Sequence, residues 1–415
     1  MPALWYVAPP VTGDKGPSLP PPARVGRYQV LAKIADGGMA AVYMARRDDG
    51  EIVAIKRIRE EFARSKDFLT MLFDEARIVS HLRHPNIVRY HELGKEGGQA
   101  FIAMELLVGQ SLWSVWEGCR ARGVRLRYEM IAWIGARVAA GLHYAHELRE
   151  GDPGQEKPLG IVHRDVNATN IFVTYDGDIK IIDFGLAKAA NRASKTAAGV
   201  IKGKVAYMSP EQAVGAAVDR RTDVFALGTT LWELACDRRL FKHADDVKTL
   251  ERVHAAEVPD PTLLVDGFPP ALWAILRRAL SRDPEDRQST AAELASELDA
   301  FVGGAVDGKV MAEVMRELFS AERARQIAWI AEASAPGGRG VAEPLQSRSS
   351  FWAADDKPRP SALPGARPPA VLAPAAVPPS GMHSDHQTTT RKLVPIVVVI
   401  VVVVVGVVVT ALALR

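Results

Sequence analysis

Three polar side chains near the middle of the chain could together carry out proton transfer beside a bound metal ion. Asp165 and Asn170 stand five residues apart in a polar loop that follows an apolar stretch, residues 161–162. Asp183 ends a second apolar stretch, which has the pattern of a buried strand. Two such loops can face each other across a cleft, where one carboxylate accepts a proton. The other carboxylate and the carboxamide supply the oxygen ligands that hard divalent cations prefer.

The order and spacing of these residues match two motifs of one family. The catalytic-loop pattern H-R-D-x-x-x-x-N occurs at residues 163–170, and D-F-G occurs at residues 183–185. The chain therefore resembles the serine/threonine protein kinases, in the eukaryotic-like form found in bacteria. The resemblance implies an α+β fold of two lobes, one small and rich in β-strands and one larger and helical. It also implies that Asp165 deprotonates an acceptor hydroxyl while Asn170 and Asp183 hold Mg²⁺.

The resemblance places an ATP site in the stretches before these loops. A strand expected over residues 28–34 and the small-residue turn after it match the pattern G-x-G-x-x-G-x-V, of which the middle glycine, Gly37, is kept. The V-A-I-K pattern at residues 53–56 ends in Lys56, the expected partner of the α- and β-phosphates. The residues expected around the nucleotide, apart from the hinge, are Ile34, Gly37, Gly38, Val42, Ala54 and Lys56.

An acid on a helix is expected to hold this lysine in place. Residues 68–81 have the apolar spacing of a helix. Glu75 lies within it, in the position of the family's helix glutamate, and by resemblance it pairs with Lys56. Asp74 is the competing acid and is expected to face solvent.

The next apolar strand, expected over residues 101–107, resembles the hinge between the two lobes. By that resemblance Met104 is the gatekeeper, and the backbone at Glu105 and Leu107 meets the adenine. Residues 111–148 then have mostly helical spacing. The residues of this stretch expected in the core are Ile131, Trp133, Ile134, Val138, Leu142 and Ala145.

The region after D-F-G resembles the family's activation segment. Residues 186–205 show little hydrophobic periodicity, and residues 207–211 stand where the family has A-P-E. Ser194 and Thr196 are the expected phosphorylation sites, because a phosphate there could pair with Arg164.

Two further acids are expected to support the catalytic loop and the segment after it. By resemblance, Asp223 bonds to the backbone around His163 and Arg164. Glu211 is expected to pair with Arg287 inside the larger lobe.

The chain departs from the family pattern near Asp165. Asn167 stands where serine/threonine kinases usually carry a lysine that meets the γ-phosphate, and Lys204 replaces a threonine that usually bonds to the catalytic aspartate. Either Lys204 supplies the missing cation or catalysis is weaker. We expect an active enzyme. The alternative is a pseudokinase or ATP-binding scaffold, and a kinase of small molecules is a weaker candidate because residues 207–211 resemble a peptide-docking platform.

Composition sets wider limits. The 415 residues allow two or three domains, and 48% hydrophobic with 24% charged residues are typical of a globular chain. The formal net charge of +3 gives no indication of nucleic-acid binding. Cys119 and Cys236 lack the spacing of a metal site and favour a reducing compartment. The first residues do not have the pattern of a signal peptide.

The sequence predicts five segments. They are a disordered proline-rich arm (1–26), a protein kinase domain (27–302), an amphipathic helical extension (303–334), a linker rich in Pro, Ala and Ser (335–392) and a transmembrane helix (393–414). The extension is expected to pack on the larger lobe, with a regulatory role left open. The polar loop 149–160 is either a partner site or an inert insertion.

The transmembrane prediction rests on residues 393–414, which are uncharged and rich in valine. At about 1.5 Å per residue they suffice to cross a hydrocarbon core of about 30 Å. Arg391 and Lys392 precede this run and favour a cytoplasmic position for the kinase domain. We therefore expect a single-pass, tail-anchored protein of the inner (cytoplasmic) membrane. Its expected partners are protein substrates, ATP and membrane lipid, with a homodimer for trans-autophosphorylation left open.

Overall fold

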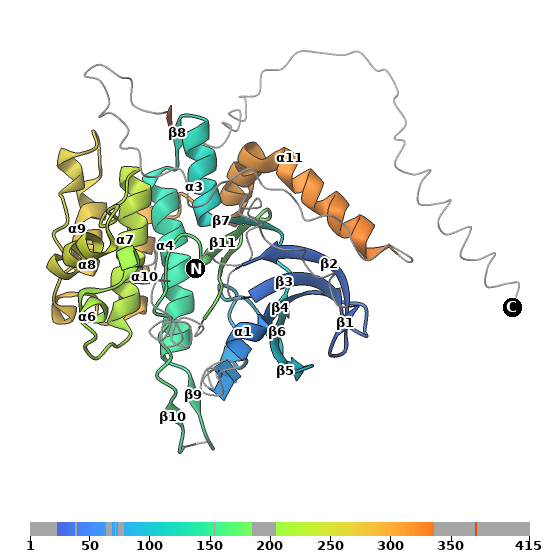
Figure 1. Cartoon of the computed structure of the whole chain (residues 1–415). Coiled ribbons are helices and arrows are strands. Elements are labelled where there is room, and N and C mark those ends of the chain that lie inside the picture. The colour runs from blue at the N-terminus through green and yellow to red at the C-terminus, as the bar shows by residue number, and fades with distance from the viewer. Residues whose placement is uncertain are drawn as a thin grey trace, which may run out of the picture. The chain divides into compact units, whose positions relative to one another are not determined.

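The small lobe is an antiparallel sheet of six strands (Figure 1). The computed structural model describes residues 23–37, 40–63, 69–70, 72–73, 79–152, 154–184, 205–335 and 370–371. The strands lie in the order β1-β2-β3-β4-β6-β5. Their bounds are Arg24–Val25 (β1), Tyr28–Asp36 (β2), Ala40–Arg46 (β3), Ile52–Ile58 (β4), Tyr90–Glu96 (β5) and Gln99–Glu105 (β6), with the short helix α1 (Glu60–Ala63) after β4.

Alternation along these strands decides which side chains face the larger lobe. Val42 pairs with Lys56 across β3 and β4, and Ala54 pairs with Met104 across β4 and β6. Val42, Ala54 and Met104 belong to the main core, which continues into the larger lobe. Their neighbours along the strands, Ile55 among them, form a separate cluster on the outer face. Because side chains alternate between the faces of a sheet, Lys56 shares the inner face with Ala54.

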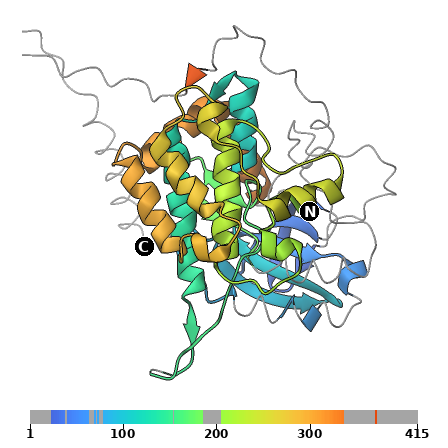
Figure 2. The same ribbon diagram turned by 90° about the vertical axis from the view of Figure 1, so that its left-hand side faces the viewer.

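The larger lobe is mainly helical (Figure 2). A three-stranded sheet in the order β12-β11-β7 lies where it meets the small lobe. The bounds along the chain are β7 (Gly109–Ser111), α3 (Leu112–Ala121), β8 (Val124–Arg125), α4 (Tyr128–His146), β9 (Arg149–Glu150), β10 (Lys157–Pro158), β11 (Ile171–Thr174), β12 (Ile179–Ile181), η1 (Val205–Tyr207), α6 (Pro210–Ala213), α7 (Arg221–Cys236), α8 (Asp246–Ala255), η2 (Pro261–Leu263), α9 (Pro270–Ala279), η3 (Pro284–Asp286), α10 (Ala291–Val302), α11 (Gly308–Ser334) and β13 (Ala370–Val371), which pairs with β8.

The core predicted for residues 111–148 is confirmed, since the apolar stripe of α4 and Trp133 are buried. The stretch is divided into two helices, however, because Gly123 has a φ of +66° between them, a conformation that ends a helix. Residues 84–88 lead into β5 and are not themselves a strand. Pro85 cannot donate a ladder hydrogen bond, and Ile87 forms an isolated bridge with Ile181 instead. The loop 149–160 contains the hairpin β9–β10.

Several expected features lie outside the described residues. They are Gly38, Asp74, Glu75, Ser194, Thr196, Lys204 and the run 393–414. Within 68–81, the described residues 69–70, 72–73 and 79 are helical, and residues 80–81 form a turn, so the helix ends before the predicted residue 81. In the part of the chain that the structure describes, no helix combines the length and the apolar character needed to span a bilayer.

Helix α11 lies outside the compact helices of the larger lobe and runs along α3 toward β2 (Figure 1). In its first half the side chains of five residues are buried in the core, which confirms the predicted packing on the larger lobe. They are Met311, Val314, Met315, Leu318 and Phe319. Phe319 has non-helical dihedral angles, φ −135° and ψ 28°. The second half approaches the small lobe, where the Arg46 guanidinium donates to the carbonyl oxygen of Ser334. The helix therefore contacts both lobes.

We predict that the contact between α3 and α11 depends on Gly118 and Phe319. A Cβ atom at Gly118 would lie 2.8 Å from the ring atom Cζ of Phe319. Phe319→Ala should cost about 3–5 kcal/mol of unfolding free energy. Gly118→Ala should destabilise the wild-type chain, but in the Phe319→Ala background it should stabilise by up to about 1 kcal/mol through helix propensity. Urea unfolding of the four chains measures this coupling, and additive effects would contradict it.

Candidate active site

Asp223 is a carboxylate with 0% exposure beneath the catalytic loop, residues 163–170. Its Oδ2 accepts the backbone N–H of His163 and its Oδ1 accepts that of Arg164, each at 2.8 Å. These bonds confirm the prediction for Asp223. The Nε2 of His146, at the end of α4, lies 2.8 Å from Oδ2. Because the carboxylate can only accept, the ring donates, and sequence analysis had given His146 no role.

The donors around Asp223 keep its charge stable in the interior. Burial alone raises the pKa of Asp223, but the hydrogen bond and electrostatic effect of His146, with the hydrogen bond from the His163 backbone, outweigh burial and bring the pKa below its ordinary value. The adjacent Arg164 has a φ of 65°, which is uncommon for a residue with a side chain. The bond from its N–H to Asp223 stabilises this sharp turn directly before Asp165.

The ring of His163 joins the catalytic loop to the stretch before Asp183. Its Nδ1 accepts the N–H of Asp165 at 3.2 Å, so Nε2 carries the proton and donates to the carbonyl oxygen of Ile182 at 3.0 Å. The ring also packs edge-on against Phe184, with centroids 4.6 Å apart. The two polar loops are thereby held at a fixed separation.

Asp165, the expected proton acceptor, is held by two carboxamides. The Nδ2 of Asn170 donates to Oδ2 of Asp165 at 2.9 Å and to its carbonyl oxygen at 2.7 Å. The Nδ2 of Asn167 donates to Oδ1 of Asp165 at 3.2 Å and to the same carbonyl oxygen at 2.9 Å. The sequence had marked Asn167 as a departure without predicting this contact.

The residues expected to hold Mg²⁺ fit a cation that shares its ligands with phosphates. The Oδ1 of Asn170 is buried without a hydrogen-bond partner among the described residues, while its Nδ2 is occupied by Asp165. A buried carboxamide oxygen of this kind is a suitable ligand for a hard cation. No group of three or more His, Cys, Asp or Glu in the described ranges could hold a metal ion without further ligands. Mg²⁺ bound through one carboxylate, one carboxamide and phosphate oxygens agrees with this arrangement.

Lys56 reaches Asp183 from the inner face of β4. Its Nζ lies 2.7 Å from Oδ1 of Asp183, and the lysine is 4% exposed. The predicted pairing with Glu75 stays a prediction, since Glu75 lies outside the described residues. Burial and, second, the charge of Asp183 raise the pKa of Tyr90, so its phenol stays neutral beside this pair.

Glu105, in the hinge, is bonded both to the residue before β5 and to β12 of the larger lobe. The backbone N–H of Glu105 donates to the carbonyl oxygen of Arg89 at 2.9 Å, and its carboxylate accepts from Lys180 Nζ at 3.0 Å. A base could therefore meet the backbone of Glu105 only through its carbonyl oxygen. The N–H of Leu107 has no partner in the described part of the chain and is available to a base. Met104 is buried behind the hinge.

The inner face of the small lobe presents the expected apolar lining. Ile34, Val42 and Ala54 are all buried there. The turn between β2 and β3 is closed by the N–H of Gly37, which donates to the carbonyl oxygen of Ala40 at 3.0 Å. Arg59 holds the same turn by donating to the carbonyl oxygen of Gly37 at 2.8 Å and pairing with Asp36.

Glu211 and Arg287 form the predicted ion pair. Two bonds of 2.9 Å join the guanidinium to the two carboxylate oxygens, and the side chain of Arg287 is 0% exposed. Its remaining N–H groups donate to the carbonyl oxygens of Ser281, Arg282 and Arg221. Burial raises the pKa of Glu211, but hydrogen bonds from Arg287 and Thr222 outweigh burial and lower it below its ordinary value.

This pair anchors the end of the segment that leads back to the catalytic loop. Glu211 lies in α6, where Ser209 and Gln212 form a capping box. The Nε2 of Gln212 donates to the carbonyl oxygen of Arg164 at 3.3 Å. The described end of the expected activation segment is thus bonded to the residue next to Asp165.

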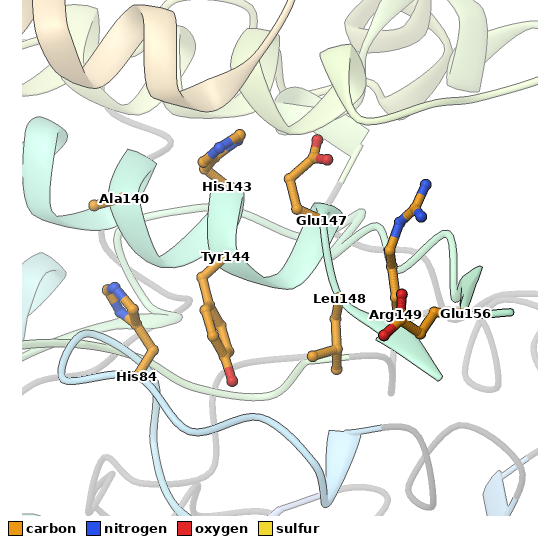
Figure 3. Close-up of a pocket in the computed structure, with 8 residues that line it drawn as sticks. All are labelled: His84, Ala140, His143, Tyr144, Glu147, Leu148, Arg149 and Glu156. Atoms are coloured by element: carbon orange, nitrogen blue, oxygen red, sulfur yellow. The ribbon is translucent and has the colours of Figure 1, made fainter. Parts of the chain in front are cut away.

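A separate pocket lies at the end of α4 (Figure 3). It measures about 550 Å³ and is lined by His84, Ala140, His143, Tyr144, Glu147, Leu148, Arg149 and Glu156. None of the expected catalytic residues lines it. Arg149 and Glu156 come from the hairpin region 149–160, so this insertion closes one side of the pocket. Its use as a partner site stays open.

We predict that removing Arg287 destabilises the chain strongly, because Glu211 would stay buried and unpaired. Arg287→Met should cost about 3–5 kcal/mol in urea unfolding near neutral pH. The double variant Glu211→Gln/Arg287→Met should recover part of that loss. Since the pKa of Glu211 is lowered in the folded chain, the pair stabilises fully above the ordinary pKa of a glutamate and loses its effect as the pH falls through the lowered pKa.

The matched control is an exposed arginine–glutamate pair, in which a guanidinium nitrogen of Arg220 lies 2.6 Å from Oε1 of Glu147. Arg220→Met should change the unfolding free energy by no more than about 1 kcal/mol. Equal losses in Arg220→Met and Arg287→Met would contradict the importance assigned to the buried pair. A difference between wild type and Arg287→Met that grows in acid would contradict the direction of the Glu211 shift.

Comparison with known proteins agrees with this geometry. The model of the protein kinase domain family matches residues 28–298. Tyrosine-protein kinase MasK of Myxococcus xanthus is 39% identical over 290 residues, 68% of this chain and 44% of that protein. Serine/threonine-protein kinase PknL of Mycobacterium tuberculosis is 35% identical over 278 residues, 66% of this chain and 65% of that protein. PrkC of Bacillus subtilis, also a serine/threonine-protein kinase, is 34% identical over 275 residues, 66% of this chain and 40% of that protein.

The similarity extends to solved structures. The crystal structure of the M. tuberculosis PknI kinase domain superimposes with a TM-score of 0.51 at 25% identity, covering 67% of this chain and 96% of that one. This chain spans 44%, 65% and 40% of the lengths of MasK, PknL and PrkC. The similarity to these relatives therefore concerns the kinase domain and only part of their lengths. With its two lobes, its paired polar loops and these matches, the chain belongs to the protein kinase family.

Proposed function

We propose that this chain is a serine/threonine protein kinase that transfers the γ-phosphate of ATP to hydroxyl groups of proteins, itself included. The observation that carries the proposal is the convergence of four side chains from three elements. Lys56 from β4 meets Asp183 at 2.7 Å, and Asn170 meets Asp165 at 2.9 Å in the catalytic loop. The His163 ring joins the two loops, and Asp223 fixes the start of the catalytic loop.

Each of these side chains has a part in phosphoryl transfer. Asp165 orients the acceptor hydroxyl and takes its proton, because a carboxylate held by two donors points in one direction. Lys56 meets the α- and β-phosphates, and Leu107 offers its N–H to the base. Asn170 and Asp183 would hold Mg²⁺, which supplies neutralisation of the phosphate charge when bound. The protein's own contribution is positioning and electrostatic stabilisation.

The acceptor residue is part of the proposal. PknL and PrkC are named serine/threonine-protein kinases, whereas MasK is named a tyrosine-protein kinase. We favour serine and threonine because two of these three relatives, PknL and PrkC, are named for those acceptors. Ser194 and Thr196 are the proposed autophosphorylation sites, and a phosphate on either would pair with Arg164.

We predict that the full-length chain incorporates phosphate from labelled ATP into its own serine or threonine residues in the presence of Mg²⁺. Asp165→Asn should lower the rate by about two orders of magnitude or more, the usual scale for loss of a general base. Asp266→Asn is the control, because Asp266 is exposed and lies outside the site. Mass spectrometry identifies the modified residues.

Three results would decide against the proposal. Equal rates for wild type and Asp165→Asn would point to a contaminating kinase. Phosphate found solely on tyrosine would exclude the serine/threonine assignment. Nucleotide binding without any transfer would favour the pseudokinase alternative.

We also propose that residues 393–414 anchor the chain in the inner membrane, with the kinase domain in the cytoplasm. The support is the uncharged, valine-rich run, long enough to cross a hydrocarbon core of about 30 Å, and the two basic residues before it. Helix α11 and the proline-rich residues after it would then connect the kinase domain to the bilayer.

We predict that the full-length chain stays with membranes after carbonate extraction, because an apolar run of this length is costly to expose to water. A chain ending at residue 390 should be found in the soluble fraction and keep its activity. Protease added outside intact cells should leave the kinase domain uncut. Release of the full-length chain by carbonate would contradict the anchor, and digestion from outside would contradict its orientation.

A further inference from the structure

The carboxamide of Asn167 uses its whole hydrogen-bonding capacity. Its two N–H groups point to the carbonyl oxygen and to Oδ1 of Asp165, at 2.9 and 3.2 Å. Its Oδ1 accepts the backbone N–H of Thr169 at 2.8 Å and the Thr169 hydroxyl. A carboxamide offers two donors and two lone pairs, so all four are engaged.

These partners also fix the orientation of the carboxamide. In the reversed orientation the Asn167 oxygen would face two acceptor atoms of Asp165, and its NH₂ group would face the N–H of Thr169. Both contacts would be repulsive, so a single orientation satisfies the network. Asn167 is 4% exposed, which leaves little access for water to replace these bonds.

The bonds complement those of Asn170. Asn170 donates to Oδ2 of Asp165 and Asn167 donates to Oδ1, so the carboxylate plane is held from both oxygens. A carboxylate has about four acceptor sites, and these two bonds occupy two of them. Neither carboxamide carries a charge, so both hold the carboxylate through neutral donors.

We propose that Asn167 is a positioning residue that holds the Asp165 carboxylate in the orientation needed to accept the substrate proton. The inference rests on the proposed function. It gives Asn167 a task at the aspartate itself, and this task does not require the cation usual at that position. The network runs through neighbouring residues of one loop, from Thr169 through Asn167 to Asp165, so it is built into the loop before a substrate arrives.

A simpler account is that Asn167 is a turn residue. An asparagine whose Oδ1 accepts the N–H two residues on forms an Asx turn, which stabilises a loop without acting on chemistry. The two accounts differ in which half of the carboxamide matters. The turn needs the oxygen that accepts from Thr169, whereas positioning needs the N–H groups that donate to Asp165.

Substitutions at Asn167 in the full-length chain separate the two halves. Asn167→Asp and Asn167→Ser keep an oxygen for the turn but lose the carboxamide donors, and Asn167→Ala loses both. Positioning predicts that kcat falls by about 10- to 100-fold in all three, the scale of a small misplacement of a reacting group. The KM for ATP should stay within about threefold of wild type, because the loss concerns the transition state rather than nucleotide binding. The unfolding midpoint of Asn167→Ser should stay close to that of wild type.

Two controls accompany these variants. Thr169→Val removes the hydroxyl at the far end of the network but keeps the N–H, so it should lower kcat less than Asn167→Ser. Gln155→Ala removes a carboxamide from an exposed loop and should leave all parameters unchanged.

The outcomes are distinct. If Asn167→Asp and Asn167→Ser keep the kcat of wild type, Asn167 is a turn residue and the inference fails. Parallel losses of kcat, nucleotide affinity and unfolding midpoint would show a structural role and would also overturn it. If the wild-type chain transfers no phosphate at all, the proposed function fails first. A wild type that transfers phosphate while Asn167→Ser does so equally well overturns this inference alone.

Discussion

The buried charge of Asp223 is the constraint on which the rest of the site depends. A carboxylate with no solvent contact is stable only when donors surround it, and here the donors are the backbone of His163 and Arg164 and the ring of His146. Satisfying this charge fixes the path of the chain at the start of the catalytic loop. It also stabilises the left-handed conformation of Arg164, which sets the direction in which the next residue, Asp165, leaves the turn. The position of the Asp165 carboxylate thus depends on the hydrogen bonds between buried Asp223 and the backbone of the two preceding residues.

A second buried charge, that of Arg287, has the same role around α6 in the larger lobe. Arg287 satisfies all of its N–H groups within the protein, two of them on Glu211. Through α6 and Gln212 this pair is connected to the carbonyl oxygen of Arg164. Asp223 and the Arg287–Glu211 pair are therefore both connected to Arg164, the first at its N–H and the second, through Gln212, at its carbonyl oxygen.

Much of this could be predicted from sequence because the signals are local. The match to the Gly-rich and V-A-I-K patterns placed Val42, Ala54 and Lys56 around the nucleotide, and the helical stripe of α4 identified its core. The motifs gave Asp223 and Glu211 their partners through a known resemblance. Other features depend on how a loop is folded in three dimensions. The contact of Asn167 with Asp165 requires a turn whose dihedral angles no spacing rule supplies, and His146 meets Asp223 only after α4 and α7 have packed together.

Helix boundaries show the same limit. The stretch 111–148 has continuous helical spacing, but a single residue, Gly123, adopts a positive φ that divides it. The apolar face of α11 was readable as a period of three to four residues. In its second half Ile327 is exposed, while Trp329, Ile330 and Ala333 pack against the core, and this route was not evident from the pattern.

That route has a mechanical consequence. Helix α11 is bonded to the larger lobe at Arg122, to the strand after the hinge through Gln326 and Gly109, and to the small lobe at Arg46. A change in the angle between the lobes must therefore break one of these bonds or bend the helix, and Phe319 is the point where it already departs from helical geometry. Lobe angle and helix shape are thus linked variables, and linkage is reciprocal. A force or binding event that acts on the chain after Ser334 would therefore change the free energy of lobe closure. Lobe closure would change the free energy of that event by the same amount.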